Sequence, residues 1–159
     1  LIDGQPIHRP MARDQRVAYI AENPSQMMLF QDMSYLRNLT FCLPRQIDSW
    51  FRRRSIYRSL RRELTPELGA VFDKDIRDLN TQEKYALIFR RVLLQQPRVV
   101  FFEQPFWGND VLLQQHIERQ VQLLLAKKIA VVVLIVGIYD AFPLAERTLI
   151  YKNGHLLTQ

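Results

Sequence analysis

The sequence is poor in cysteine and glycine and contains no long apolar run. A single cysteine, Cys42, among 159 residues excludes an internal disulfide framework and is typical of a reducing cytosol. The five glycines form no Gly-x-x-x-x-Gly-Lys-Ser/Thr loop, the usual cradle for the phosphates of a nucleotide. The longest apolar run, residues 129–136, is far shorter than the roughly 20 residues that a membrane-spanning helix requires. The histidines His8, His116 and His155 lack ligand spacing, so we expect no metal site.

The composition is that of one globular domain. Hydrophobic residues make up 48% and charged residues 24% of the chain, which argues against disorder and allows a sizeable core. The sequence starts at Leu1, within what reads as a strand, so we expect it to be part of a longer protein. The net charge of +6 permits an acidic partner such as nucleic acid or anionic lipid headgroups. Much of that excess comes from one group of arginines: Arg52, Arg53, Arg54, Arg58, Arg61 and Arg62.

Strands and helices alternate, which predicts an α/β fold. Two apolar segments, 98–102 and 129–136, predict interior strands of a parallel sheet, because such strands are buried on both faces. The helix predicted at 50–64 has an apolar stripe that includes Tyr57 and Leu60, with the arginines on the adjoining face. The other predicted elements are a hairpin at Asp3-Gly4, a strand at 17–20, helices at 33–41, 83–95 and 110–127, a short helical segment at 139–145, and a closing hairpin at Asn153-Gly154.

Three consecutive segments resemble the second half of an ABC-type ATPase domain. They are LNTQE at 79–83, RVVFFEQP at 98–105 and FWGND at 106–110, which stand where the family has its signature loop, Walker B strand and D-loop. The resemblance covers almost the whole chain. It is closest to the second ABC domain of the tandem ATPases of sugar and nucleoside importers, through AYIAE at 18–22 and MSYLRNLT at 33–40. It implies a P-loop NTPase-like ABC core, as one partial domain over 1–159, with a helical subdomain inserted at about 32–78. The P-loop portion would lie upstream of Leu1 or be lacking.

The nucleotide-contacting positions depart from the family pattern. Asn80, Thr81 and Gln82 stand where the signature loop has Ser-Gly-Gly, and side chains at the two glycine positions should obstruct the approach of a γ-phosphate. Glu22 stands at the Q-loop position, as is common in the sugar-type second domains, and Asp110 matches the D-loop aspartate. The resemblance therefore marks these five residues as degenerate nucleotide-binding positions.

The catalytic positions depart further. Glu103 stands for the Walker B aspartate, where a longer carboxylate could still hold Mg²⁺ through water, or could merely cap the following turn. Gln104 stands for the glutamate that would polarise the attacking water, and a neutral amide cannot accept the proton. Gly137 falls near the switch position, where no titratable side chain is available. No catalytic group is intact at these positions.

The resemblance implies a catalytically silent ABC domain in the cytoplasm, peripheral to the inner face of the cell membrane. Its partners would be an intact ABC ATPase domain and a membrane permease subunit. The family uses ATP and magnesium, but we expect no cofactor for this chain alone. The permease contact maps to Met27, Met28, Leu29 and Phe30, for which core packing is an equally good interpretation. Two alternatives stay open: an ATPase completed by upstream residues, and a basic module in which the arginines bind an anionic partner or nucleic acid. Nucleic acid is the less expected of these partners, because the sequence lacks the glycine and aromatic patterns of base-reading modules.

Overall fold

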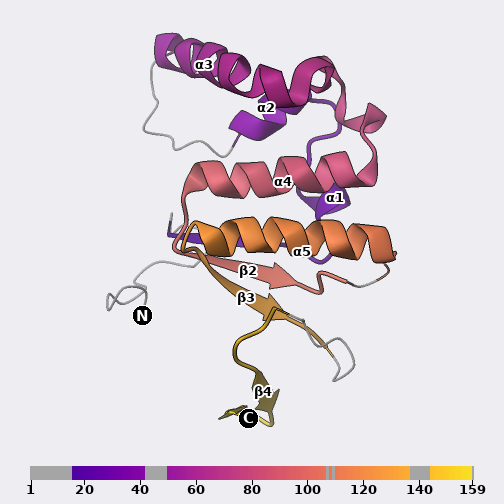
Figure 1. The fold of residues 1–159 in the computed structure, drawn as a ribbon, viewed down its shortest axis with the longest axis vertical. Helices are drawn as coiled ribbons and strands as arrows, with labels where there is room; N and C mark the ends of the chain where they lie inside the picture. The colour runs from indigo at the N-terminus through magenta and orange to yellow at the C-terminus, as the bar shows by residue number, and fades with distance from the viewer. Residues whose placement is uncertain (1–15, 42–49, 107, 109, 137–143, 159) are drawn as a thin grey trace.

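The computed structural model describes residues 16–41, 50–106, 108, 110–136 and 144–158 (Figure 1). At its centre are three parallel strands, β1 (Val17–Ile20), β2 (Val99–Glu103) and β3 (Ala130–Leu134), in the order β1-β2-β3. Tyr19 pairs with Phe101, and Phe102 pairs with both Ile20 and Val133. The predicted α/β class with a parallel sheet is confirmed. None of the described helices is long and apolar enough to cross a membrane.

Two helices, α4 (Thr81–Gln95) and α5 (Val111–Ala126), lie side by side against one face of the sheet (Figure 1). The apolar residues of α5 recur at three- and four-residue steps, so one stripe of the helix is buried. In α4 the ring of Phe89 meets Phe102 of β2 edge to face, with the ring centroids 5.7 Å apart. Both helices begin one or two residues from the predicted positions, because Asn80 and Asp110 serve as their N-caps.

A second group of helices lies beyond α4, on the side away from the sheet (Figure 1). It contains α2 (Tyr35–Thr40), α3 (Trp50–Leu68) and the 3-10 turns η2 (Gly69–Asp73) and η3 (Ile76–Asp78), while the short α1 (Pro24–Met27) packs on α4. Helix α3 continues to Leu68 with Pro66 inside it, so its predicted end at Leu64 was too early. The limits of a helical subdomain at about 32–78 stay a prediction.

The prediction of a fully buried strand at 129–136 was wrong. Strand β3 pairs with β2 alone and forms an edge of the described sheet. Val131 and Val133 pack against the core, whereas Val132 and Leu134 are exposed on the opposite face. An apolar run predicts a strand, but its burial depends on what covers each face, and no described element covers the outer face here.

The closing hairpin is confirmed as β4 (Leu149–Lys152) paired with β5 (His155–Thr158). Its turn residues Asn153 and Gly154 both have positive φ, of 51° and 84°, as the two-residue hairpin turn that favours Asn-Gly requires. The hairpin predicted at Asp3-Gly4, the start of the helical segment predicted at 139–145, and Cys42 lie outside the described residues.

Candidate functional site

The first candidate region is the carboxyl end of β2, where Glu103 is the last strand residue. The hydroxyl of Tyr19, from β1, donates a hydrogen bond to Oε2 of Glu103. That hydrogen bond, ahead of burial and of the negative charges of Glu103 and Glu22, raises the pKa of the Tyr19 hydroxyl above its usual value. Glu103 is therefore hydrogen-bonded across the two strands, and the negative charge of Glu22 lies close enough to raise the pKa of the same hydroxyl.

Gln104 also connects strands. Its backbone is left-handed, with φ 46°, and its N–H donates to the carbonyl oxygen of Leu134 at 2.8 Å. Its side-chain Oε1 accepts a hydrogen bond from the N–H of Val136 at 3.4 Å. The amide thus extends the link between β2 and β3 by one residue. Gly137, the expected switch position, lies outside the described residues.

Asn80 is the N-cap residue of α4. Its Oδ1 accepts a hydrogen bond from the N–H of Glu83 at 2.8 Å, and Oε2 of Glu83 accepts one from the N–H of Asn80 at 2.8 Å. This reciprocal pair is a capping box, which satisfies two helix-end donors at once. Thr81 and Gln82 lie exposed in the first turn. Asp110 caps α5 in a similar way, accepting from the N–H of Leu113 at 2.8 Å.

The residues at these positions offer a magnesium nucleotide few of the groups that such a site uses. Magnesium at such sites is bound through one or two carboxylates together with phosphate oxygens. Oε2 of Glu103 accepts a hydrogen bond from Tyr19, which leaves Oε1 as the oxygen without that bond, and the neighbouring Gln104 carries no charge. Across the described part of the chain, no three acidic, histidine or cysteine side chains gather into a metal site built from protein groups alone. At the signature positions, the side chain of Asn80 is used to cap α4, and Thr81 and Gln82 carry side chains where glycine would expose the backbone.

The second candidate region is the segment that leaves β1, forms α1 and leads into α2. Two hydrogen bonds to Met28 and the buried side chain of Leu29 hold this segment against the rest of the domain. The N–H of Ala21 donates to Sδ of Met28 at 3.4 Å, and the guanidinium of Arg91, a buried residue of α4, donates to the carbonyl oxygen of Met28. The adjacent Leu29 is 6% exposed and belongs to the core. Its expected place on a contact surface is therefore corrected, because its side chain points inward.

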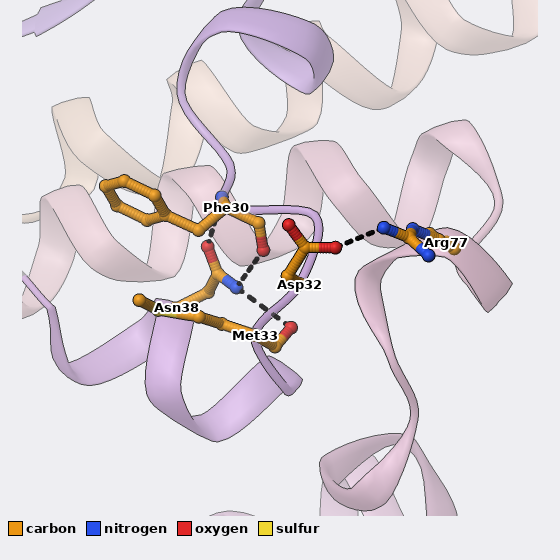
Figure 2. Close-up of polar contacts among 5 residues, drawn as sticks. All are labelled: Phe30, Asp32, Met33, Asn38 and Arg77. Carbon is orange, nitrogen blue, oxygen red and sulfur yellow. Dashed lines mark hydrogen bonds and ion pairs between the residues drawn. The ribbon is translucent and has the colours of Figure 1, made fainter.

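Asn38 of α2 holds the next part of this segment (Figure 2). Its side chain is fully buried, and its Oδ1 accepts a hydrogen bond from the N–H of Phe30 at 2.8 Å. Its Nδ2 lies within hydrogen-bond distance of the carbonyl oxygens of Phe30, Met33 and Ser34, at 3.0, 3.2 and 3.3 Å. Sequence reasoning placed Asn38 only within a family-like stretch. A buried, fully bonded asparagine cannot be recognised before the loop around it is placed.

The outer side of the same segment carries an apolar surface. Met27 is 73% exposed and Phe30 is 41% exposed, whereas Met28 is half-buried. Phe41, which follows α2, is 56% exposed, and its ring lies 4.4 Å from that of Phe30 between centroids. We call Met27, Phe30 and Phe41 the apolar contact surface. Large apolar side chains grouped in this way often mark a binding site for another protein.

Comparisons with known proteins agree on one fold. No family model matches the chain. It is 24% identical over 170 residues, 99% of the chain, to a Pseudomonas fluorescens protein named as a ribose/galactose/methyl galactoside import ATP-binding protein, and covers 32% of that protein. It is 27% identical over 142 residues, 89% of the chain, to the lipopolysaccharide export system ATP-binding protein LptB of Acidithiobacillus ferridurans, and covers 57% of it.

A solved structure gives the same result. CbiO1 from Clostridium perfringens, described as part of the ABC transporter complex CbiONQ, matches with a TM-score of 0.64 at 18% identity. The match covers 90% of this chain and 56% of CbiO1. The chain thus spans about a third of the first relative and little more than half of the other two proteins.

Proposed function

We propose that the chain, whose fold is that of an ABC ATPase domain, is a non-hydrolysing partner in an ABC transporter. The observation that carries the proposal is Gln104. A position that would need a carboxylate to take a proton from water holds a neutral amide, and that amide is hydrogen-bonded into the link between β2 and β3. The fold is kept while the group that would perform the chemistry is absent from this position.

The partners follow from this division of labour. A domain without its own catalytic groups would act by pairing with an intact ABC ATPase domain, which binds ATP and magnesium. It would transmit the movement of that partner to a membrane permease subunit. This places the chain in the cytoplasm, peripheral to the inner face of the cell membrane. The apolar contact surface is the site that we assign to the permease, because the exposed rings of Phe30 and Phe41 contact each other and Met27 is exposed three residues before Phe30.

We assign the transporter to the sugar or nucleoside importer type. The support is the family-like stretch from Ser34, which precedes α2, to Asn38 within it, together with the similarity to a protein named for ribose, galactose and methyl galactoside import. The second relative is named for an export system, so a transport assay with the full transporter decides between the two directions.

Association with the cognate membrane subunit tests the proposal. Met27→Asp and Phe30→Asp each place a charge on the apolar contact surface, and we expect either variant to lose at least about 90% of the subunit captured by the wild-type chain, which corresponds to more than 1.4 kcal/mol. Gln26→Asp is the matched control, because it puts the same charge on an exposed, polar position of α1. Circular dichroism of each variant checks the fold. Equal capture by all four proteins would refute this surface as the permease contact.

A second candidate function rests on the arginines of α3. Arg54, Arg58, Arg61 and Arg62 are exposed and lie at helical spacing on one side of the helix, where Arg61 pairs with Asp73 at 2.6 Å. Such a face could bind phosphate groups of an anionic partner, with an affinity that falls as salt is raised. Charge reversal at Arg58 and Arg62 would then abolish the association that Met27→Asp leaves intact.

A further inference from the structure

The segment that carries the apolar contact surface is held from inside the molecule. The side chain of Asn38 binds both backbone groups of Phe30 and reaches the carbonyl oxygen of Met33 (Figure 2). It also lies within hydrogen-bond distance of the carbonyl oxygen of Ser34. The Asn38 side chain that makes these contacts has no exposed surface. The loop between α1 and α2 is therefore folded around the amide of Asn38.

An ion pair on the outside of this loop is far less suited to hold it. Asp32 pairs with Arg77 of η3, and their side chains are 84% and 69% exposed (Figure 2). Exposed ion pairs contribute little, because water screens the charges and both side chains lose freedom on pairing. Removing the Asn38 amide, in contrast, takes the acceptor from the N–H of Phe30 and the donor from the carbonyl oxygen of Met33. The carbonyl oxygens of Phe30 and Ser34 keep backbone N–H donors. Among the side chains that bind this loop, Asn38 thus contacts its backbone at the largest number of described points.

The same helix also supports the ring of Phe30 from the outer side. Phe41 follows directly after α2, and its ring stands 4.4 Å from that of Phe30 at an angle of 53°. The backbone of Phe30 is bound by Asn38 and its ring is contacted by Phe41, so its side chain is presented in one direction. An interaction surface that is ordered before binding avoids the entropy loss of ordering it on contact.

We propose that Asn38 is the positioning residue of the apolar contact surface: it sets the direction in which Phe30 meets a protein partner, without touching that partner itself. The proposal rests on the proposed function only in taking this surface to be the permease contact. Hydrophobic side chains offered in a fixed arrangement fit the apolar face of an amphipathic helix.

The first experiment needs no partner. Amide hydrogen exchange of the full chain is compared between the wild type, Asn38→Ser and Thr40→Val. Thr40 is a matched control, because its hydroxyl donates to the carbonyl oxygens of Leu36 and Arg37 within α2 and does not reach the loop. We expect exchange at the Phe30 N–H to accelerate by about tenfold in Asn38→Ser and to change less than about twofold in Thr40→Val.

The exchange rates and the folding of the variants decide whether Asn38 holds the loop. Equal exchange rates at Phe30 in the two variants would overturn the proposal. If Asn38→Ser fails to fold, Asn38→Gln is measured in its place, since it keeps the amide group but moves it one methylene away from its position against the Phe30 N–H. Unfolding of both variants would also overturn the proposal, because Asn38 would then hold the whole domain rather than the loop.

The second experiment is the capture of the cognate membrane subunit. We expect folded Asn38→Ser to capture at least about fivefold less subunit than Thr40→Val, although every side chain of the contact surface is unchanged. Full capture by Asn38→Ser, with faster exchange at Phe30, would overturn the positioning role. If Phe30→Asp itself leaves capture intact, the proposed permease contact fails, while the exchange rates still decide whether Asn38 holds the loop.

Discussion

Several polar side chains of this domain bind backbone groups at the ends of helices and strands. Asn80 and Asp110 cap α4 and α5, Gln104 bonds beyond the end of β3, and Asn38 organises a loop. Three of these residues stand at positions where the ABC resemblance places nucleotide chemistry. In this chain, their hydrogen-bonding capacity is used for structure instead.

Removal of the α4 cap is the first prediction at the scale of a residue. Asn80→Ala should lower the free energy of unfolding by about 1 kcal/mol, because the N–H of Glu83 loses its acceptor, whereas Asn80→Ser should retain most of the stability. Urea unfolding followed by circular dichroism measures both. Equal losses in the two variants would show that the capping box contributes little.

His116 gives the second prediction. Burial, and then the charge of Arg119, lowers the pKa of the His116 imidazole below its usual value, and its Nε2 is buried without a partner among the described residues. The unfolded chain therefore takes up a proton near pH 6.5 that the folded chain resists, so stability is complete above about pH 7 and falls as the pH drops through 6.5.

His116→Gln should remove this part of the pH dependence. The urea midpoints of wild type and variant, measured at pH 7.5 and pH 5.5, provide the test, and the exposed His155 of β5 offers a control substitution. A wild-type loss on acidification that persists unchanged in His116→Gln would assign the effect to other groups.

At the scale of an element, β3 shows how a parallel strand behaves at an edge. Its outer residues Val132 and Leu134 are exposed, whereas Val131 and Val133 complete the layer under α5. The strand is apolar on both sides, yet only one side is covered by a described element.

A matched pair of substitutions tests this two-sided character. Val133→Thr should cost about 1 kcal/mol, because it places a hydroxyl in half-buried apolar surroundings. Val132→Thr has the same shape and β-branching at an exposed position, so it should stay within about 0.5 kcal/mol of the wild type. Thermal or urea unfolding compares them, and equal costs would mean that the outer face is also covered in the protein as it folds.

At the scale of the whole molecule, the chain by itself should neither hydrolyse ATP nor bind it tightly. Gln104 cannot accept a proton, Glu103 is tied to Tyr19, and the signature positions carry Asn80, Thr81 and Gln82. Calorimetry and a phosphate-release assay in the presence of Mg²⁺ check this, with an intact ABC ATPase domain as the positive control. Magnesium-dependent turnover that survives repurification and disappears in Glu103→Gln would refute it.

The sequence by itself determined the features that depend on near neighbours along the chain. The apolar strand runs, the helical periodicity of α4 and α5, their cap residues and the Asn153-Gly154 turn all act over a few residues, so the α/β class, the parallel strands and the closing hairpin followed from them. The amide at Gln104 is likewise a property of the sequence alone.

Only the tertiary structure decided which of these side chains face inward, which face solvent, and which meet. Leu29 and Phe30 are adjacent and both apolar, yet one is in the core and the other on the surface. Arg91 binds the backbone before Leu29, and Asn38 binds the backbone of Phe30. The contact between Tyr19 and Glu103 joins residues 84 positions apart, and the exposure of one side of β3 depends on which elements cover the sheet. Burial and long-range hydrogen bonds depend on the packing of distant elements, which short-range patterns do not encode.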